Sequence, residues 1–279
     1  MVISVNNTKG GVGKSTTITT FAQILAAAGY KVLVIDLDPQ MNTTRIINPE
    51  YASLELNYEH LFCEKQFRKE TVEEFIISTS NENINLLPAD KQFFKIIYKI
   101  YEVEKQTSAG MIFKKNIDFI KDDYDYIIID NSPFQSYLTT LGYFIADKVI
   151  IPVESDNFSY EGIMDLITDI EEINKDYSLN IEFGGIFMTR IDTRTVRFKQ
   201  LSDSYRENFG DKFIPVYIRK NEPLAQANTM YLGLLDFDKK CNAVEDYINL
   251  ADYLGLIDKK HMNTLNKFIN KKNWLKRLE

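Results

Sequence analysis

The chain has 279 residues, of which 44% are hydrophobic and 26% charged, a balance typical of a folded globular protein and far from that of a disordered one. Its two cysteines, Cys63 and Cys241, exclude a disulfide framework and a four-sulfur zinc site, so a reducing cytoplasm is the expected location. The net charge of −7 hides two basic zones, because residues 258–279 carry +5 and residues 190–220 hold eight Lys or Arg against four Asp or Glu.

Short apolar runs alternate with helix-like stretches, a pattern typical of a parallel sheet with helices on both faces. The runs lack strict alternation because both faces of such strands are buried. The expected strands are Val2 to Asn6, Lys31 to Asp36, Ile84 to Pro88, Tyr126 to Asp130, Lys148 to Pro152, Ile181 to Thr189 and Phe213 to Ile218. The expected helices are Lys14 to Ala28, Glu161 to Asn174 and Phe198 to Asn208. The sequence therefore predicts an α/β fold with a doubly wound, mostly parallel sheet.

Residues 1–257 are expected to form one domain, because neither a fixed-period repeat nor a Pro- or Ser-rich linker divides them. Residues 51–123 mix Lys, Phe, Tyr and Ile at irregular spacing. We expect this segment to pack mainly as helices around the short strand at Ile84.

The strongest chemical signal is a glycine-rich loop between the first strand and the first helix. Its residues are Lys9, Gly10, Gly11, Val12, Gly13, Lys14, Ser15 and Thr16. In this order, backbone N–H groups and the helix dipole converge on a polyphosphate, Lys14 reaches the β- and γ-phosphates, and the Ser15 hydroxyl binds Mg²⁺. The usual pattern has glycine where this chain has Thr8, and Lys9 precedes the glycines as an added lysine. The loop predicts a deviant form of the P-loop that binds nucleotide.

Two further strands end in carboxylates at the edge where a doubly wound sheet has its ligand crevice. Asp36 and Asp38 follow the second strand, and Asp130 ends the run Tyr126 to Asp130. Asp130 is the candidate carboxylate for holding Mg²⁺ through a metal-bound water, and Asp38 is the candidate for orienting or activating the attacking water. The alternative is that Asp36 and Asp130 only cap the following turns and that Asp38 is a solvated turn residue.

Together with the loop, the segments Asp36-Leu37-Asp38-Pro39-Gln40 and Asp130-Asn131-Ser132-Pro133 resemble the ParA family of deviant-Walker ATPases. The likeness extends through Ile151-Pro152-Val153-Glu154 to the stretch around Asp192-Thr193-Arg194-Thr195, and so covers residues 1 to about 255. The resemblance implies an ATPase that dimerises with two nucleotides between its subunits and binds DNA nonspecifically. It also implies a DNA-bound adaptor protein that stimulates hydrolysis, and a cytoplasmic, nucleoid-associated location.

The resemblance also assigns roles to individual residues. Lys9 would reach the phosphates held by the other subunit, Lys14 would act in its own subunit, and Asp38 would serve hydrolysis. The stretch containing Arg219 and Asn221 would border the adenine, as its counterpart does in relatives. A lysine from a second subunit adds positive charge where charge develops on the γ-phosphate, as an arginine finger does elsewhere.

Basic residues late in the chain line the DNA-binding face of family dimers. Arg194 matches one such position, while the next family arginine falls on Pro223, so that contact is missing or displaced to Arg219 or Lys220. Arg197 and Lys199 are further candidates, with a solvated helix face as the alternative for both. Contacts of this kind to phosphate would give salt-dependent, sequence-indifferent binding.

The final segment, residues 258–279, is expected to form a basic amphipathic helix. Three interpretations stay open: a helix docked on the domain, an extension that contacts DNA, and a membrane anchor like that of MinD. The alternative function is therefore a membrane-cycling positioning ATPase similar to MinD. Iron–sulfur carriers that share the loop need paired cysteines, which this chain lacks, and metabolic ligases with a related loop remain an alternative.

Overall fold

The computed structural model describes residues 1–51, 57–64, 68–104, 108–132, 137–154 and 160–270. One sheet runs through this part of the chain, with strand order β3-β4-β2-β5-β1-β6-β7-β8. The strands are β1 (Val2–Val5), β2 (Val32–Asp36), β3 (Ile77–Ser78), β4 (Ile84–Leu87), β5 (Tyr126–Asp130), β6 (Lys148–Glu154), β7 (Glu182–Ile191) and β8 (Phe213–Arg219). All neighbouring pairs are parallel except β3 with β4.

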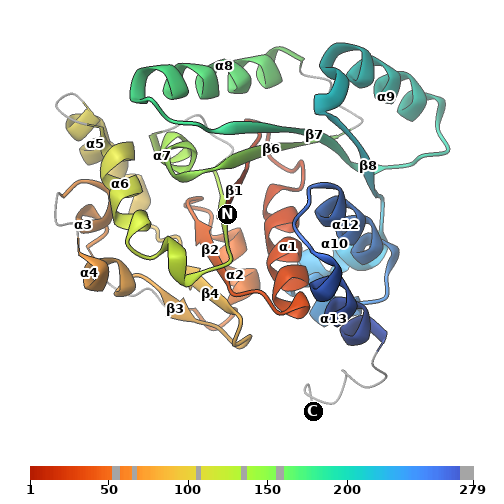
Figure 1. Cartoon of the computed structure of the whole chain (residues 1–279), viewed down its shortest axis with the longest axis horizontal. Coiled ribbons are helices and arrows are strands. Elements are labelled where there is room, and N and C mark those ends of the chain that lie inside the picture. The colour runs from red at the N-terminus through yellow and green to blue at the C-terminus, as the bar shows by residue number, and fades with distance from the viewer. Residues whose placement is uncertain (52–56, 65–67, 105–107, 133–136, 155–159, 271–279) are drawn as a thin grey trace.

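Helices cover both faces of this sheet (Figure 1). One face carries α1 (Lys14–Ala28), α10 (Glu222–Thr229), α11 (Leu234–Asp238), α12 (Asn242–Tyr253) and α13 (Lys259–Asn270). The other carries α3 (Glu59–Phe62), α4 (Lys69–Glu73), α5 (Phe93–Glu104), α6 (Ala109–Asp118), α7 (Tyr137–Ile145), α8 (Tyr160–Tyr177) and α9 (Val196–Phe209). The short α2 (Asn42–Ile47) follows β2. The predicted doubly wound α/β fold is confirmed.

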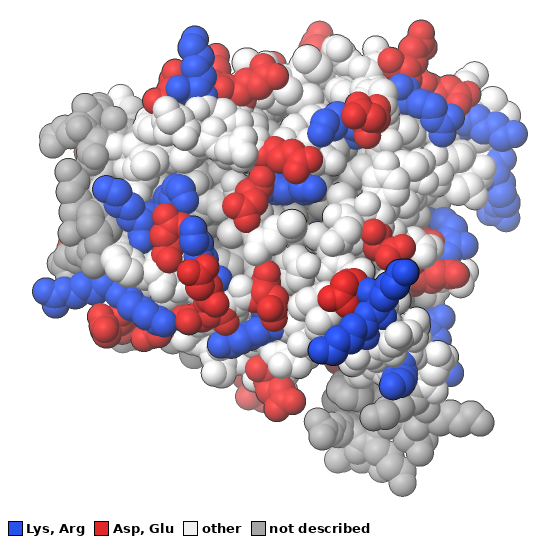
Figure 2. All heavy atoms as spheres, in the orientation of Figure 1, with Lys and Arg blue, Asp and Glu red and all other residues white. Residues whose placement is uncertain are grey.

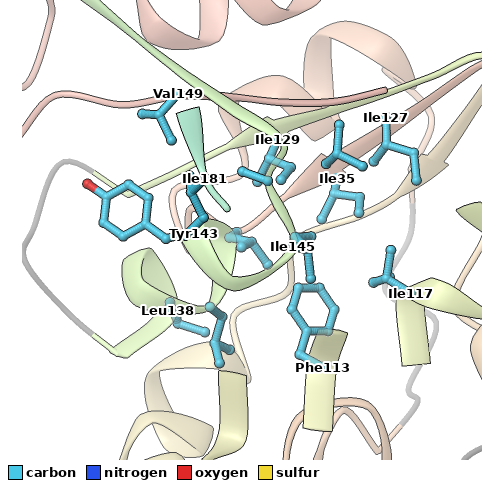
Figure 3. Close-up of a cluster of buried hydrophobic side chains, with 14 of the residues drawn as sticks. Ile35, Phe113, Ile117, Ile127, Ile129, Leu138, Tyr143, Ile145, Val149 and Ile181 are labelled. Atoms are coloured by element: carbon cyan, nitrogen blue, oxygen red, sulfur yellow. The ribbon is translucent and has the colours of Figure 1, made fainter. Parts of the chain in front are cut away.

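Burial on both faces explains the continuous apolar strands. In β2, Leu33 and Ile35 belong to one core cluster, while Val32 and Val34 belong to the cluster on the opposite face. Figure 3 shows part of the first cluster, in which strand residues such as Ile35 lie against side chains of α6 and α7. Because every strand residue of this kind is buried, the strand cannot show a period of two.

The ends of α1 follow from its flanking glycines. The helix covers Lys14–Ala28, as predicted, and both Gly13 and Gly29 adopt left-handed backbone conformations at its ends. A glycine has no Cβ that would clash in this conformation, so it readily ends a helix there. The position of Lys14 at the first turn of α1 is therefore set by the local sequence.

One strand escaped prediction. β3 contains only Ile77 and Ser78, pairs antiparallel with β4, and leaves Ser78 exposed. A two-residue edge strand with one exposed polar residue gives no apolar run to detect. Elsewhere, the observed strands begin or end within about two residues of the predicted bounds.

The C-terminal helix α13 packs against α1. Leu265 is fully buried there, and Met262, Phe268 and Ile269 pack against the same core cluster. The apolar face of the segment is therefore turned toward the domain over Lys259–Asn270, while residues 271–279, including Trp274, lie outside the described residues. Within the described ranges, none of the helices has the length and apolarity needed to cross a bilayer.

Candidate functional site

The loop between β1 and α1 presents backbone N–H groups at the start of a helix. Gly11 and Gly13 have φ angles of 82° and 90°, which glycine adopts without strain. The N-cap residue of α1, Gly13, offers no side chain to cap the helix, and the first turn of α1 holds no acidic residue. The N–H groups and the positive end of the helix dipole are therefore left to an external anion.

Lys14 lies inside this loop. Its Nζ donates hydrogen bonds to the carbonyl oxygens of Asn7 at 2.9 Å and Lys9 at 2.8 Å. Burial lowers the pKa of Lys14, while the negative charges of Asp130 and Asp38 oppose that shift. A buried ammonium group that is held by the loop itself is positioned to bind phosphate oxygens.

Residues far along the chain support the loop and were not predicted. Thr189 at the end of β7 donates its hydroxyl to the carbonyl oxygen of Val12 at 2.8 Å. Asn228 of α10 donates to the Thr16 hydroxyl at 3.0 Å. Neither contact leaves a local sequence signal, because its partners are separated by 177 or 212 residues.

A cavity of about 600 Å³ opens beside the loop. Its lining consists of Gly10, Gly11, Gly13, Lys14, Ser15, Thr16, Asp38, Gln40, Asn42, Ile46, Asn228, Thr229 and Tyr231. The structure thus brings most of the predicted loop residues together with Asp38. The volume lies in the range of small-molecule sites.

Lys9 and Val12 line a second cavity, of about 300 Å³. Asn7, Glu154 and Tyr205 also border this second cavity. The two lysines of the loop are therefore separated: Lys14 lines the larger cavity, whereas Lys9 lines the smaller one.

Asp36 and Asp130 occupy paired positions at the ends of β2 and β5. The carboxylate of Asp36 accepts hydrogen bonds from the backbone N–H of Asp38 at 3.0 Å and from the N–H and hydroxyl of Thr44 at 2.8 and 2.7 Å. Burial and the neighbouring charge of Asp130 raise the pKa of Asp36. Its contacts are those of a residue that holds the following turn and α2, as the alternative interpretation proposed.

The carboxylate of Asp130 accepts fewer hydrogen bonds than that of Asp36. Its Oδ2 accepts a hydrogen bond from the Thr43 hydroxyl at 2.6 Å, whereas its buried Oδ1 has no hydrogen-bond partner among the described residues. Burial raises the pKa of Asp130 to about 6, against the effects of the hydroxyls of Thr43 and Ser15. A buried carboxylate oxygen with spare capacity beside Ser15 is suited to a hydrated cation.

The oxygen atoms at this site fit an Mg²⁺ ion that is bound mainly by phosphates and waters. Within the described residues no group of three His, Cys, Asp or Glu side chains could hold a metal ion. Mg²⁺ is commonly bound through one or two protein oxygens together with substrate phosphates and waters. Ser15 and Asp130 can supply such oxygens.

Asp38 is buried at the edge of the larger cavity. Its Oδ1 accepts a hydrogen bond from the backbone N–H of Gln40 at 3.0 Å. Burial raises the pKa of Asp38, while the hydrogen bond from Gln40 and the charge of Lys14 lower it. This placement puts the carboxylate at the wall of the larger cavity, in the same lining as Lys14 and Ser15.

Arg219 and Asn221 do not line the larger cavity. The guanidinium of Arg219 binds Asp246 of α12, with its Nε and Nη2 at 2.9 and 2.6 Å from Oδ1. The Asn221 side chain accepts a hydrogen bond from the N–H of Leu224 and so caps α10. The cavity wall beyond Thr16 is instead formed by Asn228, Thr229 and Tyr231.

The other predicted DNA contacts lie on the surface around α9. The side chain of Arg194 is 87% exposed and binds Asp192 through Nε and Nη2 at 2.9 and 2.8 Å. Arg197, Lys199 and Lys220 are also exposed. Figure 2 shows acidic and basic side chains interspersed over this view, with basic ones gathered at the right edge beside α9.

A glycine loop that follows the central strand, opens a helix and holds a buried lysine opposite a strand-end carboxylate is the site of a P-loop nucleotide-binding protein. Residues 1–183 match the family model described as an AAA domain. The chain therefore belongs to this family, and its resemblance to the ParA ATPases is confirmed by its relatives.

The sporulation initiation inhibitor protein Soj of Bacillus subtilis is 29% identical over 90% of this chain and 96% of its own length. The chromosome partitioning protein ParA of Caulobacter vibrioides is 28% identical over 90% and 92%. Among solved structures, McdA of Cyanothece in complex with ATP has a TM-score of 0.78 at 19% identity, covering 92% of this chain and 97% of that one. Cobyrinic acid a,c-diamide synthase of Mycobacterium smegmatis, with bound ADP and magnesium, has a TM-score of 0.72 at 21% identity, covering 90% and 92%.

Proposed function

We propose that this protein is a DNA-segregation ATPase that forms a dimer around two ATP molecules and binds DNA nonspecifically in that state. A DNA-bound adaptor protein then stimulates hydrolysis and ends the cycle. The observation that carries the proposal is the separation of the two loop lysines, since Lys14 serves the larger cavity while Lys9 lines a different one. The partition proteins among its sequence relatives support the cellular role.

Within one subunit, the chain's own groups account for binding and for positioning of water. The loop N–H groups and Lys14 hold the phosphates, and Asp38 orients a water molecule toward the γ-phosphate. Ser15 and Asp130 would hold Mg²⁺, which neutralises charge on the phosphates when bound. Hydrolysis removes the γ-phosphate contacts that favour the dimer, so the nucleotide state sets the assembly state.

The dimer is tested by replacing Lys9. We expect Lys9→Ala to bind an ATP analogue with wild-type affinity but to remain monomeric in light scattering, because the cross-subunit charge is lost. Lys95→Ala, which removes an exposed lysine of α5, is the matched control and should dimerise normally. A Lys9→Ala protein that dimerises with ATP as the wild type does would refute the cross-subunit role.

DNA binding is tested by reversing the charge of Arg194. Each lost phosphate contact lowers the slope of log K against log salt by about 0.9. In gel shifts with ATP, we expect Arg194→Glu to reduce the magnitude of that slope by about 0.9 or more, which corresponds to the loss of at least one phosphate contact. ATP binding should be unchanged. Lys95→Glu, on the opposite flank of the sheet, is the control. Equal affinity of the Arg194→Glu and wild-type proteins at several salt concentrations would reject Arg194 as a contact.

The membrane-cycling alternative has weaker support, because α13 buries its apolar face against α1. ATP hydrolysis measured with DNA, with anionic liposomes and with neither separates the two functions. Stimulation by DNA supports segregation, whereas liposome binding that depends on ATP supports the positioning ATPase. Hydrolysis that depends on a small carboxylic acid would instead indicate a metabolic ligase.

A further inference from the structure

Strained backbone gathers around the larger cavity. Four non-glycine residues of the described chain have positive φ angles: Met41, Ser178, Arg190 and Tyr231. Tyr231 lines the cavity, Met41 lies between the lining residues Gln40 and Asn42, and Arg190 touches the glycine loop. Such conformations persist only where the surroundings fix them, and they cluster at functional sites.

Arg190, with φ of 53°, lies near the end of β7 and contacts the loop from the sheet side. Its Nη1 donates to the carbonyl oxygen of Gly11 at 3.2 Å and to Oε1 of Glu154 at 2.9 Å. Glu154 ends β6, pairs with Thr189 of β7, and its side chain is only 17% exposed. The guanidinium therefore joins a fixed carboxylate to the loop.

Thr189 and Arg190 hold two consecutive carbonyl groups of the loop. Thr189 binds the carbonyl oxygen of Val12, and Arg190 binds that of Gly11. Because a peptide group is planar and trans, fixing each carbonyl also fixes the N–H of the next residue on the opposite side. The two contacts consequently aim the N–H groups of Val12 and Gly13 away from β7.

We propose that Arg190 is a positioning residue for nucleotide binding, which fixes the Gly11–Val12 peptide group and thereby prepares the loop for the triphosphate. The Arg190 guanidinium contacts the loop at the carbonyl oxygen of Gly11, and its ion pair with Glu154 keeps it there. This inference rests on the proposed nucleotide binding but needs neither the dimer nor DNA.

The test compares variants by equilibrium binding of a fluorescent, non-hydrolysable ATP analogue. Arg190→Asn removes the guanidinium while keeping a residue that tolerates the left-handed conformation. We expect its Kd to rise roughly tenfold, in keeping with the loss of a charge-assisted hydrogen bond to the loop. KM should rise by a similar factor with little change in kcat, and Arg190→Lys should recover part of the affinity.

Two more variants separate positioning from folding. Arg190→Gly relieves the backbone strain, so its Tm should equal or exceed that of the wild type although its affinity falls. Arg206→Asn is the matched control, because Arg206 is equally exposed at 59% and is also paired with a carboxylate, Asp203, but on α9. This control should bind the analogue normally.

The outcomes distinguish this inference from the proposed function. A wild-type protein that binds no nucleotide would refute the proposed function itself. A wild-type protein that binds the analogue, with Arg190→Asn equal to it in Kd and KM, would refute the positioning role alone. Loss of affinity only in proportion to a lowered Tm across the Arg190 variants would also refute that role, because it would show a purely structural contribution.

Discussion

Replacing Asp130 by asparagine should stabilise the nucleotide-free protein while removing its activity. Asp130 is fully buried, and burial raises the pKa of its carboxyl from the usual 3.8 to about 6. At 1.36 kcal/mol per pKa unit, ionisation of this group costs the native state about 3 kcal/mol at neutral pH. Asparagine keeps an oxygen that accepts the hydrogen bond from the Thr43 hydroxyl. Its neutral NH2 group replaces the charged Oδ1 of Asp130, which has no hydrogen-bond partner among the described residues.

The sign of the pH dependence follows from the raised pKa. Well below pH 3.8 the carboxyl is neutral in both states and costs nothing. The cost grows between about pH 4 and pH 6, where the unfolded state ionises before the native one, and stays constant above that range. The free energy of unfolding of the Asp130→Asn protein should therefore exceed that of the wild type by about 3 kcal/mol at pH 8 and by little at pH 4. Its neighbour Asp36 should also ionise more easily, since the charge of Asp130 is one cause of its raised pKa.

Urea unfolding in EDTA at several pH values measures this difference. With a slope of about 3 kcal/mol/M, the midpoint at pH 8 should increase by about 1 M. Asp211→Asn, which changes an exposed acid, is the control and should leave the midpoint unchanged. If the urea midpoints of the wild-type and Asp130→Asn proteins changed in parallel with pH, the ionised Asp130 carboxyl would not destabilise the native state, and the reasoning would be refuted. Addition of ATP and Mg²⁺ should then stabilise the wild type more than the variant.

Three further outcomes are expected. Lys14→Ala should lose ATP binding in equilibrium dialysis, because the ammonium held by the loop is gone; retained affinity would contradict its role. Asp38→Ala should bind ATP but not hydrolyse it and should remain dimeric in light scattering, and a normal rate of phosphate release would argue against it. Leu265→Ala should lower the free energy of unfolding by about 2–5 kcal/mol through the cavity it leaves under α13, and a change below about 0.5 kcal/mol would show that this helix contributes little.

The features predicted from sequence are those with local causes. Buried strands leave apolar runs, and the glycines beside Lys14 and after Ala28 mark the ends of α1. The strand-end carboxylates Asp36 and Asp130 follow from the same pattern, since parallel strands bring their carboxyl ends to one edge. Local sequence therefore predicts the fold class, the main strands and the loop at the start of α1.

Features that depend on distant partners were not predictable. Asn228 lies 212 residues from Thr16, so no motif joins them. The family resemblance places Arg219 beside adenine or DNA, but its partner Asp246 lies 27 residues further along, on α12. Ion pairing between elements arises from tertiary packing, which a single sequence does not encode in its spacing. Roles for Arg219 and Asn221 beside nucleotide or DNA thus remain predictions.

The central place of β1 has a consequence for biosynthesis. This strand pairs with β5 from Ile127 onward and with β6 from Lys148 onward, and both strands are synthesised more than 100 residues after it. At a translation rate of about 5–20 residues per second, roughly 6–25 s separate synthesis of β1 from that of β5. In the nascent chain the apolar strand β1 therefore stays unpaired during this interval. The loop that follows β1 is supported by the sheet only after about half of the polypeptide has been made.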